Sequence, residues 1–125
     1  MSLNELSVLI CDDSMLVRKK IKDYLNQIGI NNVFEASDGQ QAIDIYKANK
    51  PSVALMDIIM PKKTGIEAVT EILEFDKNAK VVMASSVGSQ SYLKDAIDAG
   101  AYDFLQKPIH EEHLLKLLQN IVKEG

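Results

Sequence analysis

The chain has 125 residues, of which 46% are hydrophobic and 26% are charged, and its formal net charge is −4. These values are typical of a globular domain, and they exclude a disordered chain and binding to nucleic acid through bulk positive charge. The single Cys11 excludes a disulfide scaffold. No apolar run approaches the ~18 residues of a membrane span, and no signal peptide is evident, so we expect a cytoplasmic protein without a membrane partner.

We expect a single domain over residues 1–125, because the length is that of one domain with a real core. Its ordered core should cover about residues 5–123, and residues 1–3 and 124–125 are candidates for cloning remnants. The sequence would then be one domain of a longer protein.

Five short apolar runs alternate with amphipathic segments along the chain. Their length and their content of Val and Ile predict strands, and their near-continuous apolar character is typical of strands buried on both faces of a parallel sheet. The runs are residues 6–11, 33–36, 53–56, 80–85 and 102–106.

The segments between the runs have the periodicity of helices. Apolar residues recur at spacings of three and four in sets such as Val17, Ile21, Leu25 and Ile28; Ile66, Val69 and Leu73; and Leu114, Leu117 or Leu118, and Ile121. Residues 38–41 (DGQQ) and 64–67 (TGIE) match the capping box that begins helices. Gly29 and Gly100 stand where helices would end.

This alternation predicts five βα units and therefore an α/β fold with a doubly wound, five-stranded parallel sheet. Five units are too few to close an eight-stranded barrel. In open sheets of this kind, ligands bind at the carboxyl ends of the strands. The residues that follow each strand are therefore the candidates for function.

Four of the five predicted strands end in charged or hydroxyl side chains. Asp12 and Asp13 follow the first strand, Asp57 the third, Ser85 the fourth and Lys107 the fifth. Two adjacent aspartates alone would be typical of a solvated helix N-terminus. Together with an acid and a lysine at neighbouring strand ends, they indicate a site instead.

Such a site would have more negative charge than its lysine can neutralise. Two unit charges 4 Å apart interact by about 4 kcal/mol at an effective dielectric constant near 20. Oxygen ligands with room for water favour Mg²⁺ or Mn²⁺ over Zn²⁺. A lysine and a hydroxyl could then contact phosphoryl oxygens, and an aspartate can itself be the nucleophile.

Four stretches of the sequence resemble the receiver domains of response regulators, the CheY-like family. They are residues 9–14 (LICDDS), 56–61 (MDIIMP) with Gly65 after it, 84–86 (ASS) and 100–108 (GAYDFLQKP). The resemblance spans the chain, and it implies a flavodoxin-like fold with the strand order 2-1-3-4-5. It also implies a role in two-component signal transduction.

The resemblance implies that Asp57 accepts a phosphoryl group from a histidine kinase in a Mg²⁺-dependent reaction. Asp13, Asp57 and the backbone carbonyl of Ile59 would hold Mg²⁺ (or Mn²⁺), and Asp12 would contribute through a bound water. The protein would then be a phosphoacceptor that assists its own phosphorylation, and not an enzyme acting on a separate substrate.

The resemblance also implies a conformational switch. Ser85 would hydrogen-bond a phosphoryl oxygen, and Lys107 would pair with Asp57 and then with the phosphoryl group. The Lys107–Pro108 peptide bond is expected to be cis. Phe104 would turn inward as Ser85 moves, changing the face formed by the fourth helix, the fifth strand and the fifth helix. A downstream protein or domain would bind this face. The receiver itself would be a monomer or a phosphorylation-dependent dimer.

At three positions this sequence is less polar than the family pattern that it resembles. Phe104 has no hydroxyl group that could report the two states by hydrogen bonding. Ile59 and Val87, which flank the expected phosphoryl group, are apolar and cannot orient an attacking water. We therefore expect slow autodephosphorylation.

Other features favour ordinary structural roles. Cys11 is expected in the core, and His110 and His113 on the surface without a third metal ligand. The solvated face of the first helix is expected to carry Arg18, Lys19, Lys20 and Lys22. Residues 35–37, at the end of the second strand, have no clear functional signal.

The residues disfavour three alternative functions. A phosphohydrolase with an aspartate nucleophile would need an acid at Ile59, and a flavin-binding domain would need a Gly/Ser/Thr-rich loop in place of Asp12 and Asp13. No GxxxxGK loop of an NTPase is present. A receiver domain cut from a transcriptional or enzymatic regulator and a phosphorylation-independent interaction module stay open. Residues 84–90 are more similar to chemotaxis-type receivers than to the receivers of transcription factors.

Overall fold

Five parallel strands form one sheet in the order β2-β1-β3-β4-β5, which confirms the expected fold and strand order. The computed structural model describes residues 1–124, apart from the side chain of Val87. The strands are β1 (Ser7–Cys11), β2 (Asn32–Ala36), β3 (Val53–Asp57), β4 (Val81–Ser85) and β5 (Asp103–Gln106). Each differs from its predicted run by one residue at most at either end.

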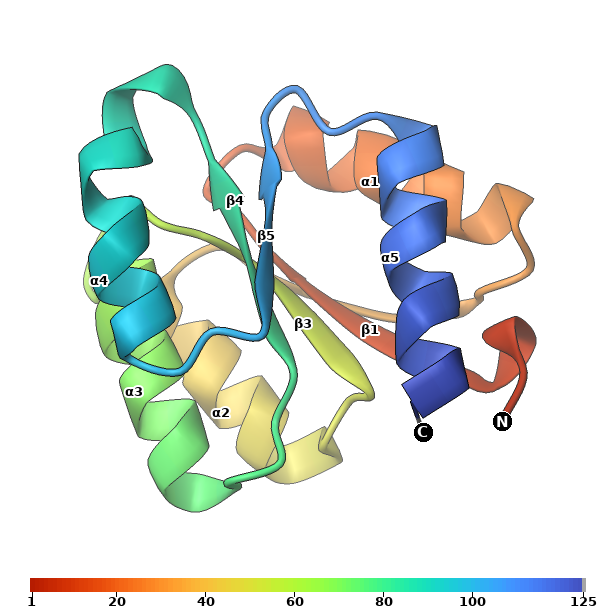
Figure 1. The fold of residues 1–125 in the computed structure, drawn as a ribbon, viewed down its shortest axis with the longest axis horizontal. Coiled ribbons are helices and arrows are strands. Elements are labelled where there is room, and N and C mark those ends of the chain that lie inside the picture. The colour runs from red at the N-terminus through yellow and green to blue at the C-terminus, as the bar shows by residue number, and fades with distance from the viewer. Residues whose placement is uncertain (125) are drawn as a thin grey trace.

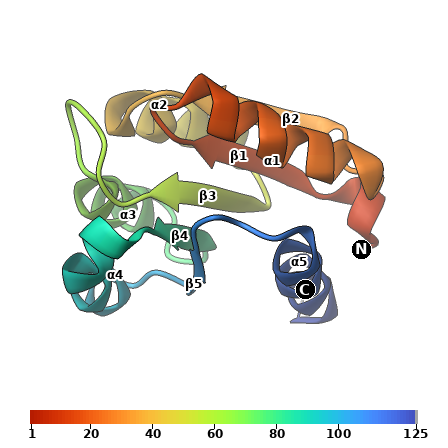
Figure 2. The same cartoon turned by 90° about the horizontal axis from the view of Figure 1, so that it is seen from above.

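Helices connect successive strands and cover both faces of the sheet (Figure 1). The α-helices are α1 (Met15–Gln27), α2 (Gly39–Asn49), α3 (Gly65–Phe75), α4 (Leu93–Asp98) and α5 (Glu111–Glu124), and the 3₁₀ helices are η1 (Leu3–Glu5) and η2 (Val87–Tyr92). Figures 1 and 2 show α1 and α5 on one side of the sheet and α2, α3 and α4 on the other. Among the described residues, no helix has the length and apolar character needed to cross a bilayer.

Two cores lie on the two faces of the sheet. Alternate residues of a strand point to opposite faces, so Leu9 packs with α2 and α3 whereas Val8 and Ile10 pack with α1 and α5. β3 and β4 are buried along their whole length. This double burial explains why the strands are near-continuous apolar runs.

Side chains cap the starts of α2 and α3. The capping box between Thr64 and Glu67 is present in both directions, as predicted. At α2, Asp38 accepts a hydrogen bond from the Gln41 backbone N–H at 2.8 Å. The second half of that predicted box is wrong, because Gln41 Oε1 accepts from the N–H of Ser37, one residue earlier.

The predicted glycine ends of two helices are confirmed. Gly29 follows α1 with φ of 91°, and Gly100 follows the α4 segment with φ of 111°. This left-handed conformation is readily available only to glycine. The Ile30 N–H then donates to the Leu25 carbonyl at 2.8 Å, which satisfies an otherwise free helix C-terminus.

The segment after β4 differs from an ordinary βα connection. The 3₁₀ helix η2 precedes α4, which is only six residues long. Ser89 is buried, and its hydroxyl accepts a hydrogen bond from the Ser86 N–H at 2.9 Å. The sequence analysis did not anticipate this short, serine-capped turn.

Candidate functional site

Parallel strands bring the polar strand ends to one edge of the sheet. Asp57 and Ser85 are the last residues of β3 and β4, Asp12 and Asp13 follow β1, and Lys107 follows β5. One carboxylate oxygen from each of the three aspartates lies within 4.8 Å of the others. Asp12, Asp57 and Ser85 are buried, while Asp13 is exposed.

Lys107 joins two of these aspartates. Its Nζ lies 2.6 Å from Asp12 Oδ2 and 3.3 Å from Asp57 Oδ2. Its backbone N–H donates to the Ser85 carbonyl at 2.7 Å, and the Lys107–Pro108 peptide bond is cis, as expected. The lysine therefore contacts Asp57, but its shorter contact is with Asp12.

Asp12 is fixed through its backbone as well as its side chain. Its N–H donates to the Ala36 carbonyl at 3.1 Å, and its Oδ1 accepts from the Ser14 N–H at 2.9 Å. Its carbonyl oxygen accepts from Arg18 Nη1 at 2.7 Å, and Arg18 Nε pairs with Glu35 at 3.2 Å. Asp12 is thus held at its N–H, its carbonyl oxygen and its carboxylate.

Arg18 and Glu35 are the residues that the sequence analysis missed. The Arg18 side chain is only 15% exposed, so its placement on the solvated face of the first helix was wrong. Glu35 lies at the end of the second predicted strand, where the sequence carries no clear functional signal. The sequence did contain a signal for Arg18. It stands one helical turn after the Ser14 N-cap, and helical side chains tilt toward the N-terminus, here toward the end of β1.

The electrostatics of the site favour an added cation. Burial raises the pKa of Asp57, the charges of Asp12 and Asp13 raise it further, and Lys107 opposes this rise. Burial lowers the pKa of Lys107, but its hydrogen bond to Asp12 and the charges of Asp57 and Asp12 outweigh burial, so its pKa lies above the ordinary value. One ammonium therefore serves three carboxylates, whose hard oxygen atoms suit Mg²⁺.

The loop after β3 packs tightly around Asp57. The Gly65 N–H donates to the Ile58 carbonyl at 2.7 Å. A Cβ atom at Gly65 would lie 2.2 Å from the Asp57 carbonyl oxygen, so only glycine fits at this position. Ile59, two residues after Asp57, is 51% exposed.

The side chains of Ser85 and Phe104, the two residues of the expected switch, make no hydrogen bond or ion pair with the three aspartates or Lys107 in the described part of the chain. Among the described residues, Ser85 Oγ makes only a long hydrogen bond, 3.4 Å, to the Ser86 carbonyl. Phe104 is 45% exposed on β5, so its ring faces outward in this structure. The side chain of Val87 lies outside what the structure describes.

The remaining singled-out residues have structural positions. Cys11 is buried as expected, and burial raises its pKa to about 12. His110 and His113 are exposed, and their rings meet edge to face at 5.6 Å. Within the described residues, neither histidine belongs to a cluster of three or more metal-ligating side chains.

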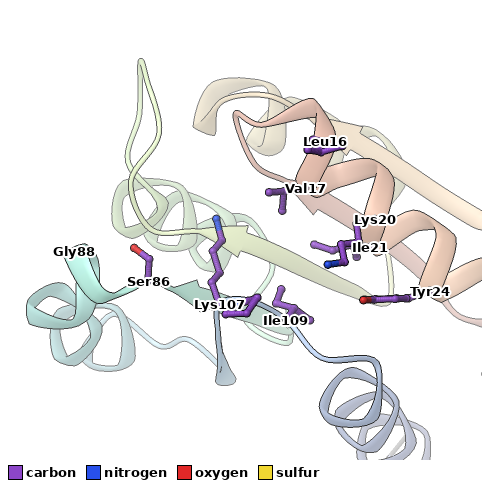
Figure 3. A pocket seen from close by; sticks show the side chains of 10 residues that line it. Leu16, Val17, Lys20, Ile21, Tyr24, Ser86, Gly88, Lys107 and Ile109 are labelled. Atoms are coloured by element: carbon purple, nitrogen blue, oxygen red, sulfur yellow. The ribbon is translucent and has the colours of Figure 1, made fainter.

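A pocket of about 630 Å³ opens beside the site, between α1 and the segments after β4 and β5. Leu16, Val17 and Ile21 of α1 form one wall, and Ile109 lies opposite. Figure 3 shows Lys107 extending along the pocket from the end of β5. The edge of the sheet that carries the three aspartates and Lys107 therefore borders an apolar surface.

Comparison with known proteins decides the family. A model of the response regulator receiver domain matches residues 8–119. The chain belongs to this family. Receiver domains are signalling proteins of two-component systems, and they bind Mg²⁺ at an acidic pocket of the kind described above.

Individual relatives show that this receiver domain is CheY-like. It is 39% identical to the chemotaxis protein CheY of Thermotoga maritima, over 93% of this chain and 97% of that protein. It superposes on a chain of the CheX–CheY–BeF3–Mg²⁺ complex of Borrelia burgdorferi with a TM-score of 0.86 and 34% identity, covering 94% of this chain and 89% of that chain. It matches NtrX of Brucella abortus with a TM-score of 0.87 and 25% identity, but 95% of this receiver domain covers only 27% of that chain.

Proposed function

We propose that this receiver domain accepts a phosphoryl group on Asp57 from the phosphohistidine of a partner histidine kinase. In this step the P–N bond breaks, its electron pair returns to the imidazole, and a P–O bond forms to an Asp57 carboxylate oxygen. The observation that carries the proposal is the contact of Asp57 with Lys107 at 3.3 Å, beside two further carboxylates. Positioning and charge neutralisation are what phosphoryl transfer requires.

Asp13, Asp57 and the Ile59 carbonyl would hold Mg²⁺, with Asp12 contributing through water. The donors are all oxygen atoms, and the three carboxylates already converge within 4.8 Å. Mn²⁺, with the same preference for oxygen, is the expected substitute. When bound, the ion would neutralise charge on the transferred oxygen atoms.

Lys107 and Ser85 would receive the phosphoryl oxygens. Lys107 can turn from Asp57 to the phosphoryl group without leaving Asp12, because Asp12 is its closer partner. Ser85 Oγ has only a 3.4 Å hydrogen bond to give up. We propose that Ser85 moves toward the phosphoryl group and that Phe104 then turns inward.

This movement would alter the surface formed by α4, β5 and α5. Ile97 and Phe104 are exposed there at 42% and 45%, so the unphosphorylated surface is apolar in part. An output protein or domain that binds only one state would shift the equilibrium between the two. We propose chemotaxis-type output, on the support of the relatives named CheY. The single domain described here would equally serve as the receiver of a longer regulator, as the match to NtrX indicates.

The histidine kinase would approach over α1. Leu16 is 76% exposed at the edge of the apolar pocket beside Lys107, and Met15 next to it is 74% exposed. An apolar rim of this kind is typical of a protein-binding surface. It would place a phosphohistidine opposite Asp57.

Intact mass after incubation with acetyl phosphate, with and without Mg²⁺, tests the proposal. We expect one phosphoryl adduct that requires Mg²⁺ and is absent from Asp57→Asn. The control is Asp44→Asn, which changes an exposed acid on α2 and should keep the adduct. An adduct that persists in Asp57→Asn would contradict the assignment. Absence of any adduct, even with a phosphorylated kinase domain, would favour a module that acts by binding alone.

A further inference from the structure

We propose that Arg18 is a positioning residue for the Mg²⁺ site, because it fixes the peptide plane that joins Asp12 to Asp13. This inference rests on the proposed function. Arg18 itself contacts none of the expected metal-binding oxygen atoms. Its guanidinium group instead contacts the backbone between two of the residues that supply them.

The contact lies where the sheet's own hydrogen bonding stops. Asp12 follows β1, and its N–H still reaches the Ala36 carbonyl beyond the last paired residues. Its carbonyl oxygen accepts from Arg18 Nη1 at 2.7 Å. A short bond from a charged donor is stronger than one between neutral groups. Arg18 therefore fixes the backbone of Asp12, the first residue after β1.

Asp13 depends on this backbone hold. Its carboxylate is exposed and, within the described part of the chain, has no hydrogen-bond partner. Because a peptide unit is planar, fixing the Asp12 carbonyl oxygen also fixes the Asp13 nitrogen and the direction in which the Asp13 Cα leaves. Asp12 has Ser14 and Lys107 as further restraints, whereas Asp13 has only its backbone.

Glu35 makes an arginine necessary at this position. Arg18 Nε lies 3.2 Å from Glu35 Oε1 while Nη1 reaches the Asp12 carbonyl, so one planar group spans two acceptors. A lysine has a single nitrogen and cannot hold both in the same fixed geometry. Lys22 also pairs with Glu35, at 3.7 Å, but it does not contact Asp12. It is the matched control.

Mg²⁺ affinity, measured by calorimetry at a temperature where every variant is folded, tests the inference. We expect about 10-fold weaker binding in Arg18→Met, since loss of an outer partner of a metal ligand commonly costs about 10–100-fold. Glu35→Gln should show a smaller loss, and Arg18→Lys should fall between Arg18→Met and the parent. Lys22→Met should stay within about 2-fold of the parent. With acetyl phosphate, Arg18→Met should need more Mg²⁺ for half-maximal phosphorylation yet reach the parent rate at saturation.

The outcomes separate this inference from the proposed function. If Arg18→Met unfolds at a lower temperature but binds Mg²⁺ as the parent does, Arg18 has only a structural role and the inference fails alone. A loss in Lys22→Met equal to that in Arg18→Met would mean that net charge matters, not position. If Arg18→Met does not fold, Glu35→Gln decides, and its unchanged affinity would overturn the inference. If the parent protein binds no Mg²⁺, the proposed function and this inference fail together.

Discussion

Lys107 Nζ lies 2.6 Å from Oδ2 of Asp12, a residue that is buried and also bound to the Ser14 N–H. The lysine is therefore anchored to a carboxylate that is itself fixed. Its contact with Asp57, at 3.3 Å, is the longer of the two. If Asp57 is phosphorylated as proposed, the lysine would stay in place through Asp12, and one ammonium would serve first the Asp57 carboxylate and then the group attached to it.

Lys107→Met should destabilise the metal-free protein. We expect the free energy of unfolding to fall by about 1–3 kcal/mol, because the substitution leaves the charges of Asp12 and Asp57 without a counterion in a partly buried site. Added Mg²⁺ should then stabilise the variant more than the parent, since in the variant the ion does not compete with the Lys107 ammonium for the carboxylates. Thermal unfolding with and without Mg²⁺ measures both effects. The exposed Lys116→Met is the control, and an equal Mg²⁺ effect in all three proteins would contradict the prediction.

Asp13→Ala should impair Mg²⁺ binding more than Asp57→Asn. The amide introduced by Asp57→Asn would keep an oxygen donor at the same position, whereas alanine leaves only water in place of the Asp13 carboxylate. We expect Asp13→Ala to lose Mg²⁺-dependent phosphorylation and Asp57→Asn to bind Mg²⁺ with reduced affinity. Calorimetric titration compares the two variants. Phosphorylation of Asp13→Ala that still depends on Mg²⁺ would show that the metal site is misplaced.

Gly65→Ala should destabilise the protein by about 2–4 kcal/mol, since overpacking next to backbone forces the chain to shift. Its Cβ would lie 2.2 Å from the Asp57 carbonyl oxygen and 2.9 Å from the Ile58 Cα. Gly88→Ala is the matched control, because a Cβ there meets nothing within 4 Å. Urea unfolding of both variants gives the comparison. Similar stability of the two would mean that the loop after β3 yields easily.

The hydrogen bond from Tyr46 to Asp76 should make part of the stability depend on pH. Asp76 accepts from the Asn78 N–H at 3.0 Å and from the Tyr46 hydroxyl at 2.9 Å, and these bonds hold its pKa below the ordinary value of 3.8. A group with a lowered folded-state pKa contributes its full stability above the unfolded-state pKa and loses it as the pH falls through the folded-state pKa. The contribution should therefore be complete at pH 7 and lost as the pH falls below the ordinary value of 3.8 and through the lowered pKa of the folded state.

Tyr46→Phe tests this dependence. Its loss of unfolding free energy should be about 1 kcal/mol at pH 7, where the acceptor is charged, and smaller in acid, where the acceptor is neutral. Urea unfolding at several pH values measures it. Tyr24→Phe is the control, and its effect should not change across this range. A Tyr46→Phe effect that is constant with pH would rule out Asp76 as the cause.

Ile59→Asn should hasten loss of the phosphoryl group. Ile59 is 51% exposed, and its apolar side chain cannot orient a water molecule toward the phosphorus. An amide in its place can do so, and we expect a several-fold faster return to the unmodified mass. Ile59→Val is the control for size. Decay of the parent protein within seconds would refute the expected slow autodephosphorylation.

The fold was accessible from the sequence because its signals are local. Strands buried on both faces appear as apolar runs, and the Thr64 and Gly29 caps are visible within a few residues of the helix ends they satisfy. The gathering of Asp57 and Lys107 followed from one further rule, that parallel strands end at the same edge. The family resemblance supplied the strand order, which periodicity alone does not contain.

The finer contacts were not accessible, because several partners compete for each polar group. The Gln41 side chain could accept from the N–H of either Asp38 or Ser37, and in the structure it accepts from Ser37. Arg18 is one of four basic residues on a helix, and its position one turn after the Ser14 N-cap does not by itself name its partners. The packed structure shows that they are the Asp12 carbonyl and Glu35. The 3₁₀ turn before α4 depends likewise on burial of Ser89.

The sequence by itself determined the succession of strands and helices along the chain and the residue types at the strand ends, since both follow from hydrophobic pattern and chain direction. Only the tertiary structure decided that Lys107 sits closer to Asp12 than to Asp57, and that Arg18 holds the backbone beside them. Lys107 and Asp12 are 95 residues apart. The two distances from the lysine nitrogen, 2.6 and 3.3 Å, differ by less than 1 Å, and that difference is set by how the whole sheet and its helices pack.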